Sequence, residues 1–207
     1  MQRSVLQKFI DFITFPIRAV TLFENNKCRL SSLRSERFDY VKREVIGYCL
    51  DVGCGKHNVF VTRYLNGNGI GIDFYPREGL SKESIIKDCT HLPFNDASFN
   101  SVTFIANFYH IPKSKRDAEL SEAYRCLKHG GNIIITMGNP IAEIIVYRLV
   151  GVYDRFLGTN IDIPREEYFT RDSEIIERLL RTGFVNISKK YFLTQWCLKH
   201  LLIGWKK

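Results

Sequence analysis

The stretch CLDVGCGKHNVF, residues 49–60, predicts a buried strand that runs directly into a turn. Its apolar start ends at Asp51, and two glycines follow at positions 53 and 55. Glycine lets a ligand approach the backbone closely and readily adopts positive φ. A dinucleotide-binding fingerprint, G-x-G-x-x-G, would require a third glycine at the position of Asn58. The stretch therefore indicates a nucleotide-type site without identifying its ligand.

Strand and helix patterns alternate from Val45 onward. Strands are predicted at Tyr48–Val52, Gly69–Asp73, Ser84–Asp88, Ser101–Ala106, Asn132–Thr136, Phe184–Phe192 and Cys197–Trp205. Helices are predicted near Val59–Leu65, Pro76–Lys82, Lys113–Lys128 and Arg171–Arg181. Alternation of this kind with apolar strands is typical of an α/β fold, in which helices cover both faces of a mostly parallel sheet. Ligands of such folds bind at the carboxyl ends of the strands.

Residues 1–40 predict a helical N-terminal extension. One helical face is apolar, with Leu6, Phe9, Ile10, Ile13, Ile17 and Val20 at the required spacing. Pro16 should break or kink this helix. We expect the extension to pack as a cap on the core, with contact to a membrane surface or a partner as the alternative. The serines of LSSLRSERFDYVKREV predict an N-capped helix that leads into the first strand.

Residues 41–207 are expected to form the main domain, so that the chain makes one structural domain overall. Within it, residues 139–170 follow no regular pattern and form a predicted insertion or lid over the carboxyl edge of the sheet. Tyr147, Tyr153 and Tyr168 are candidates there to shape a substrate pocket, although a packing role is favoured for them.

Composition narrows the classes of function. Six scattered cysteines show no C-x-x-C pair or zinc-ligand spacing, so no metal site is expected. No apolar run is long enough to span a membrane and no signal cleavage site follows the start, which favours a cytoplasmic location. The net charge of +8 suits an anionic partner such as RNA, a membrane surface or an acidic metabolite, or simply a basic surface.

Two carboxylates extend the nucleotide-type pattern. Asp73, in GIGIDF, ends the second predicted strand, at the distance from the glycine turn where a carboxylate binds both hydroxyls of a ribose. Asp88, in KDCTHLPFNDASFNSVTF, ends the third predicted strand and is suited to accept a hydrogen bond from an adenine amino group. EAYRCLKHGGNIIIT then supplies a helix, a turn and the fifth strand. These features favour an adenosine-containing ligand.

The motifs LDVGCG, GID, DCTHLPF, SFNSV and LKHGG together resemble those of class I S-adenosylmethionine-dependent methyltransferases. The resemblance is to the small-molecule type that groups with ubiquinone and menaquinone biosynthesis enzymes, and it covers about residues 50–136. It implies a Rossmann-like, seven-stranded sheet with an antiparallel last strand. It also implies S-adenosyl-L-methionine as cofactor and S-adenosyl-L-homocysteine as product.

The same resemblance implies contacts with the methionine part of the cofactor. Gly53, Cys54 and Gly55 would pass under this part, and Asp51 would orient its amino group. Asn107, after the fourth strand, would border it at the region of methyl transfer.

On the nucleoside side, the resemblance implies that Asp73 binds the ribose hydroxyls and Asp88 the adenine amino group. Cys89 would offer a backbone amide beside the adenine. The chain departs from the family pattern at residues 56–58, Lys-His-Asn, where many members have a further glycine. A solvent-exposed loop position is favoured for His57 over a catalytic one.

The methyl acceptor is left open by the motifs. Methyl transfer needs mainly in-line placement of the acceptor and exclusion of water, and a general base is needed only for a protonated acceptor such as a hydroxyl. His110 and Tyr109, in ANFYHIP, are the candidates for contact with acceptor or base. A histidine titrates near neutrality, but a structural histidine is an equal alternative.

We expect a methyltransferase that acts on a small-molecule or lipid-like acceptor. An RNA methyltransferase is less favoured, because NFYH stands where amino-directed enzymes carry paired prolines, and a non-catalytic methyltransferase-like binding module is a further alternative. A nicotinamide oxidoreductase would need the missing third glycine. Peripheral contact with a membrane is a hypothesis based on the aromatic N-terminal region and on WCLKHLLIGWKK.

Overall fold

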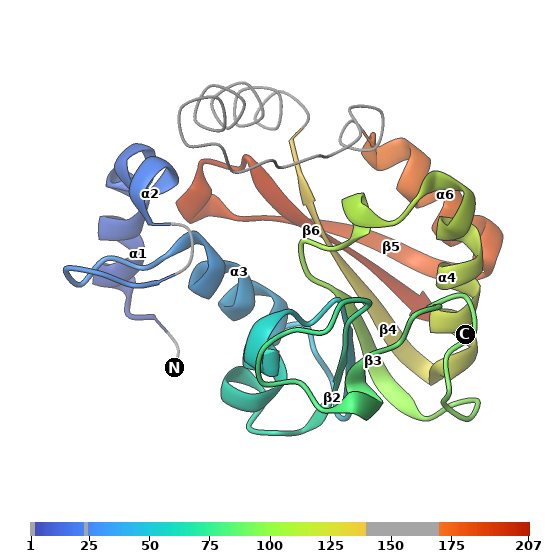
Figure 1. Ribbon diagram of the computed structural model, residues 1–207. Coiled ribbons are helices and arrows are strands. Elements are labelled where there is room, and N and C mark those ends of the chain that lie inside the picture. The colour runs from blue at the N-terminus through green and yellow to red at the C-terminus, as the bar shows by residue number, and fades with distance from the viewer. Residues whose placement is uncertain (1–2, 23–24, 140–169) are drawn as a thin grey trace.

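The structure is a computed structural model that describes residues 3–22, 25–139 and 170–207. Its helices are α1 (Val5–Ile13), α2 (Phe15–Thr21), α3 (Leu33–Lys42), α4 (Lys113–Cys126) and α6 (Asp172–Thr182) (Figure 1). Its strands are β1 (Cys49–Val52), β2 (Gly69–Ile72), β3 (Phe99–Phe104), β4 (Leu127–Gly138), β5 (Phe184–Tyr191) and β6 (Lys199–Lys206). The three tyrosines of the predicted insertion lie outside the described residues.

The strands form one sheet in the order β2-β1-β3-β4-β6-β5. Neighbouring strands from β2 to β4 pair in parallel, whereas β6 is antiparallel to both β4 and β5. The predicted α/β fold with a mostly parallel sheet and an antiparallel last strand is confirmed. Because the chain leaves β1 for β2 on one side and returns to β3 on the other, a crevice opens at the carboxyl ends of β1 and β3.

Helices cover both faces of the sheet, as predicted. Ile133 and Ile135 of β4 belong to a buried cluster with residues of α4 and α6, including Leu120 and Leu179. Ile134, between them, belongs to a second cluster that includes residues of α3. Successive side chains of a strand point to opposite faces, so β4 joins the two layers of the core.

Two elements predicted between β2 and β3 are absent from this part of the structure. The expected strand Ser84–Asp88 is reduced to one parallel bridge between Asp73 and Ile85, and the described residues form six strands instead of seven. The carboxylate of Asp73 accepts a hydrogen bond from the amide of Tyr75 (2.9 Å), which turns the chain away as soon as β2 ends. Gly79, with φ of +76°, interrupts the expected helix Pro76–Lys82.

The N-terminal helices form as predicted but face the other way. A break at Thr14 separates α1 from α2, and Pro16 lies in the first turn of α2, where a missing amide costs nothing. The expected cap would have packed its apolar stripe on the core. Instead Leu6 and Phe9 are 68% and 60% exposed, while Asp11 on the opposite side of α1 is fully buried.

The buried side of these helices is held by four charged residues, which we call the N-terminal charge cluster: Arg3, Asp11, Arg18 and Glu36. Arg18 is fully buried and donates to Glu36 Oε2 (3.1 Å) and to the carbonyl of Thr194 (3.1 Å). Arg3 lies 3.3 Å from Asp11 and 3.1 Å from Glu36. The cluster therefore ties α1 and α2 both to α3 and to the turn that precedes β6.

The N-cap predicted for the helix before the first strand is confirmed: the side chain of Ser32 caps α3 by accepting a hydrogen bond from the amide of Ser35 (3.1 Å).

Candidate active site

The turn after β1 contains two glycines with positive φ. Gly53 and Gly55 have φ of +78° and +69°, a region that favours glycine. A side chain at Gly53 would begin 2.2 Å from the amide group of Asn107, so this position has no room for one. The amides of Gly53 and Cys54 donate to the carbonyl of Ile72 (2.8 and 3.0 Å), which fixes the loop against the end of β2.

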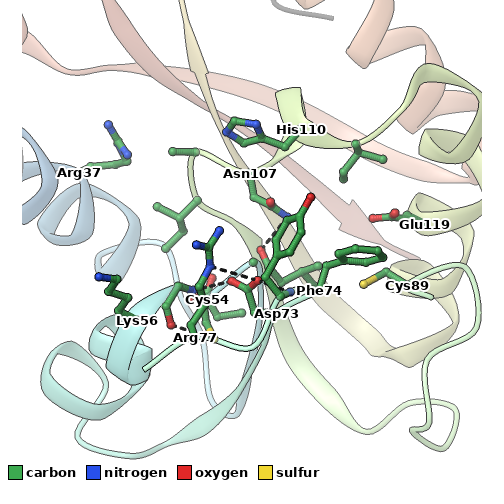
Figure 2. A pocket seen from close by; sticks show the side chains of 18 of the residues that line it. Arg37, Cys54, Lys56, Asp73, Phe74, Arg77, Cys89, Asn107, His110 and Glu119 are labelled. Carbon is green, nitrogen blue, oxygen red and sulfur yellow. Dashed lines mark hydrogen bonds and ion pairs between the residues drawn. The ribbon is translucent and has the colours of Figure 1, made fainter. Parts of the chain in front are cut away.

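A cavity of about 1040 Å³ lies over the carboxyl ends of β1, β2 and β3 (Figure 2). This is at the upper end of the roughly 300–1,000 Å³ usual for small-molecule sites. Of the predicted site residues, the cavity is lined by Asp51, Gly53, Cys54, Gly55, Asp73, Cys89, Asn107 and His110. The structure thus brings together eight of the ten residues that the sequence indicated.

Two of the carboxyl groups in the cavity lie at strand ends. Asp73 accepts hydrogen bonds from the amides of Gly55 (3.0 Å) and Tyr75 (2.9 Å), and each oxygen keeps a further lone pair. Asp51 is buried and accepts from the hydroxyl of Thr103 (2.7 Å). Burial raises the pKa of Asp51 to about 7; the Thr103 bond opposes the shift and the charge of Asp73 adds to it. Asp51 therefore sits in an environment that favours a bound cation beside it.

Asp88 does not line the cavity, contrary to its predicted contact with adenine. Its carboxylate is exposed and accepts from the hydroxyl (2.6 Å) and the amide (3.1 Å) of Thr90. These bonds lower the pKa of Asp88. The missing third strand explains the displacement, because Asp88 was expected at its end and the chain there is a turn.

A different carboxyl group, Glu119 of α4, reaches the cavity at the end where Asp88 was expected. Figure 2 shows Glu119 at this end, near Cys89 and Phe74. Its side chain is buried, and its Oε2 has no hydrogen-bond partner. Burial raises the pKa of Glu119 to about 7, against the lowering effect of Lys115. The sequence did not single it out, because Glu119 is one of three acidic residues in the polar helix KSKRDAELSEAYRC and nothing in the pattern marks it as buried.

The two predicted catalytic residues are separated by the structure. His110 lines the cavity and is exposed. Tyr109 is buried, does not line the cavity, and its hydroxyl accepts a hydrogen bond from the amide of Gly138 at the end of β4. Tyr109 therefore supports the sheet, and the prediction that it contacts the acceptor does not agree with its position.

The two loop residues after Gly55 differ in their position relative to the cavity. Lys56 lines the cavity, whereas His57 is exposed and does not. The amide of His57 donates to the carbonyl of Glu78 (2.7 Å), and its ring lies 3.6 Å from the Glu78 carboxylate. His57 is thus an exposed loop residue, the interpretation favoured from the sequence, and it also closes the loop against Glu78.

The end of the cavity below α3 is basic. Arg34 and Arg37 of α3 line it together with Lys56, and Figure 2 shows Arg37 and Lys56 on the side away from Glu119. Apolar side chains of Leu33 and Phe38 line the same end. This combination suits a molecule that has an apolar body and a negative charge. Sequence reasoning missed it because the three cations are separated along the chain.

The cysteines offer little reactivity. All six are free thiols, and burial raises the pKa of Cys89 to about 12. The thiol of Cys54, also in the cavity, has its pKa raised by burial and by the nearby carboxylates. Thiolates are the reactive form, so neither residue acts as a nucleophile near neutral pH. In the described part of the chain, no group of three His, Cys, Asp or Glu residues could hold a metal ion.

Comparisons with known proteins identify methyltransferases as similar in sequence and in fold. Residues 50–135 match the model of a methyltransferase domain family. A demethylmenaquinone methyltransferase of Lactobacillus johnsonii is 27% identical over 74% of this chain and 74% of its own length. A ubiquinone/menaquinone biosynthesis C-methyltransferase of Brucella anthropi is 27% identical over 69% of this chain and 59% of its own length. The crystal structure of an S-adenosylmethionine-dependent methyltransferase of Thermotoga maritima superimposes with a TM-score of 0.60 over 98% of both chains, at 15% identity, which supports the fold.

Proposed function

Because the chain is a class I S-adenosylmethionine-dependent methyltransferase, we propose that it methylates a small, amphipathic acceptor that carries a negative charge. The acceptor would bind at the basic end of the cavity, below α3, and the nucleoside of the cofactor at the end that holds Glu119. The observation that carries this proposal is the lining below α3, where Leu33 and Phe38 stand beside Arg34, Arg37 and Lys56; the other end holds the buried carboxyl of Glu119 together with Lys87 and Lys115.

The residues of the cavity fit S-adenosyl-L-methionine. The glycine turn is open at Gly55, where an added Cβ would meet none of the described atoms within 4 Å, so a ligand can approach the backbone there. Asp51, a buried carboxyl without a basic partner among the described residues, suits the amino group of the methionine part. The free lone pairs of Asp73 suit ribose hydroxyls. Asn107 lies beside the turn, where its amide donates to the carbonyl of Val52 (3.2 Å).

Glu119 takes the part that the sequence assigned to Asp88. A buried carboxyl oxygen without a partner costs free energy, and an adenine amino group would satisfy it. Phe74 and Cys89 lie at the same end (Figure 2) and offer the flat, apolar surroundings that a purine ring requires.

Bound S-adenosyl-L-methionine supplies a methyl group on a sulfonium, which is an activated leaving group. The protein has to hold the acceptor in line and exclude water, and orientation alone can lower such a barrier by roughly 7–11 kcal/mol. Arg37 and Lys56 are placed to bind an anionic group of the acceptor, while Leu33 and Phe38 contact its apolar body. His110 is the one histidine among the described residues that line the cavity, and it would take the proton of a hydroxyl acceptor.

The proposal is tested in two steps. Calorimetry with S-adenosyl-L-homocysteine measures cofactor binding alone. Transfer of a labelled methyl group to fractions of acidic metabolites, lipids and RNA then identifies the acceptor class, and we expect label in an anionic small molecule or lipid. Arg37→Gln should raise the acceptor KM about tenfold by removing a charged hydrogen bond, without changing the cofactor Kd.

Lys42→Gln is the matched control, because Lys42 is exposed on the same helix and does not line the cavity. Absence of cofactor binding would contradict the methyltransferase assignment itself. Cofactor binding with label only in RNA would contradict the acceptor class, and cofactor binding without any transfer would favour a non-catalytic binding module.

A further inference from the structure

Helices α1 and α2 both expose large apolar side chains on their outward side. Its large exposed residues, which we call the N-terminal apolar face, are Val5, Leu6, Phe9, Phe12, Ile13 and Ile17. Trp196 continues this face, because its ring centre lies 6.3 Å from that of Phe12 and its indole N–H donates to the Phe12 carbonyl (2.9 Å). The neighbouring Leu193 is 65% exposed. Figure 1 shows α1 and α2 at one edge of the molecule, outside the sheet and its covering helices.

Helix α1 is inverted relative to an ordinary surface helix. A helix on the surface of a globular protein normally turns its polar side to water. Here the polar side is held inside: Gln7 donates to Asp11 Oδ1 (3.0 Å) and to the carbonyl of Arg29 (3.0 Å), and Asp11 belongs to the N-terminal charge cluster. The apolar side is therefore fixed outward by the fold. An apolar surface of this extent marks an interaction site.

The exposed charges that the structure describes near this face have one sign. In residues 3–22 and 25–30, the exposed charged side chains are Lys8, Lys27 and Arg29. Asp11 is the one acidic residue of these ranges, and it is buried. Lys8 lies on α1 itself, and the bond from Gln7 to the Arg29 carbonyl places residues 27–29 next to the polar side of the same helix. An apolar surface bordered by cations complements an anionic lipid surface.

We propose that the N-terminal apolar face docks on the surface of an anionic lipid bilayer. Helices α1 and α2 would lie along the membrane, with Phe9 and its apolar neighbours in the boundary between headgroups and acyl chains and with Lys8, Lys27 and Arg29 at the phosphates. Within the described residues, no helix is long and apolar enough to cross a membrane. The proposal does not depend on which acceptor is methylated.

Co-sedimentation of the full chain with vesicles tests this contact. Vesicles of phosphatidylcholine with phosphatidylglycerol should bind the protein more strongly than vesicles of phosphatidylcholine alone. The double variant Leu6→Gln/Phe9→Gln should bind at least about tenfold more weakly, because it removes two apolar side chains from the buried interface and keeps residues of good helix propensity. The double variant Lys27→Gln/Arg29→Gln should lose about fivefold per charge and most of the preference for anionic lipid.

Two controls match these variants. Leu180→Gln removes an exposed leucine from α6, and Lys82→Gln removes an exposed cation from a turn outside the N-terminal helices. Both should bind vesicles as the wild type does, and all variants should keep its melting temperature. The proposal is overturned if wild type does not bind anionic vesicles, or if the Leu6/Phe9 variant binds as wild type does. It is equally overturned if that variant abolishes a concentration-dependent dimer, since the face would then bind a second copy of the chain.

Discussion

The protein buries ionisable side chains in two regions, and it pairs them with opposite charges in one region but not in the other. In the N-terminal charge cluster, every carboxylate faces an arginine: Arg18 lies 3.1 Å from Glu36, and Arg3 lies 3.3 Å from Asp11. In the cavity, Glu119 keeps an oxygen without any hydrogen-bond partner. In the first region each buried carboxylate has an arginine beside it, although Arg18 Nε and Glu36 Oε1 make no hydrogen bond among the described residues; in the second region the buried carboxyl groups have no arginine or lysine as a hydrogen-bond partner there.

This difference indicates which region awaits a ligand. Removing a charge from water costs several kcal/mol, and a partner inside the protein recovers part of that cost. The N-terminal charge cluster has such partners, so its role is to hold helices together. Asp51 and Glu119 lack basic hydrogen-bond partners among the described residues, and burial raises the pKa of each to about 7. A ligand with donor groups or a positive charge would complete the cavity.

The largest effect is expected at Arg18, because its loss would remove the ion pairing that distinguishes the N-terminal charge cluster from the cavity. Arg18→Met should lower the free energy of unfolding by about 3–5 kcal/mol, because it leaves the buried carboxylate of Glu36 without its Arg18 partner. Urea unfolding followed by circular dichroism measures this loss. Lys8→Met, at an exposed position of α1, is the control and should change stability by less than about 0.5 kcal/mol. A loss below about 1 kcal/mol for Arg18→Met would mean that the cluster does not hold the helices.

The cavity should respond to pH in the absence of cofactor. The folded-state pKa of Asp51 is raised to about 7, so its contribution to stability is complete below about pH 4 and is lost as pH rises through 7. The slope for one such group is at most about 1.4 kcal/mol per pH unit. Thermal melts between pH 5 and 8 should show falling stability that is flatter in Asp51→Asn. Identical slopes in both proteins would remove Asp51 as the cause.

Asp73→Asn sharpens the comparison at the ribose end. An asparagine has one acceptor oxygen, so it cannot hold the amides of both Gly55 and Tyr75, and it lacks the negative charge. Affinity for S-adenosyl-L-homocysteine should fall about 30-fold, or about 2 kcal/mol. Calorimetry measures the affinity, and a melting curve of the same sample shows whether the fold persists. Unchanged affinity in a folded variant would contradict the contact.

The smallest expected effect tests whether Glu119 or Asp88 contacts the adenine amino group of the cofactor. Glu119→Gln should weaken binding of S-adenosyl-L-homocysteine about fivefold, since the amide oxygen still accepts a bond but carries no charge. It should also reduce discrimination against the inosine analogue, because the new amide nitrogen can donate to the inosine oxygen. Competition binding with both ligands measures the two effects. Asp88→Asn should leave both values near wild type, and the reverse result would restore the contact that the sequence predicted.

The sequence predicted the fold well where several local signals agree. Helix α4 and the strands on either side of it follow long, regular patterns, and α3 carries a serine cap at Ser32. It failed between residues 74 and 88, where short patterns suggested a helix and a strand. Hydrogen bonding by Asp73 and the left-handed Gly79 decide that segment, and neither shows in hydrophobic periodicity.

The site was predictable where strand ends determine it. Asp51 lies near the end of β1, Asp73 and Asn107 follow β2 and β3, and all three line the cavity. The positions of Tyr109 and Glu119 depend instead on contacts distant in sequence, such as the bond from the amide of Gly138 to the Tyr109 hydroxyl. The direction of α1 had the same kind of cause, because its apolar stripe was visible but the charges that hold its other side are spread from residue 3 to residue 36.

The place of β6 in the sheet constrains the order of folding. This strand is synthesised after the other described strands of the sheet, yet it lies between β4 and β5 and pairs with both. Until residues 199–206 emerge, β5 has no partner in the sheet and β4 presents an open edge. The carbonyl of Thr194 that binds Arg18 also emerges late. Much of the sheet therefore has to assemble after residues 199–206 have been synthesised, through contacts of high sequence separation that form slowly and leave strand edges exposed to aggregation meanwhile.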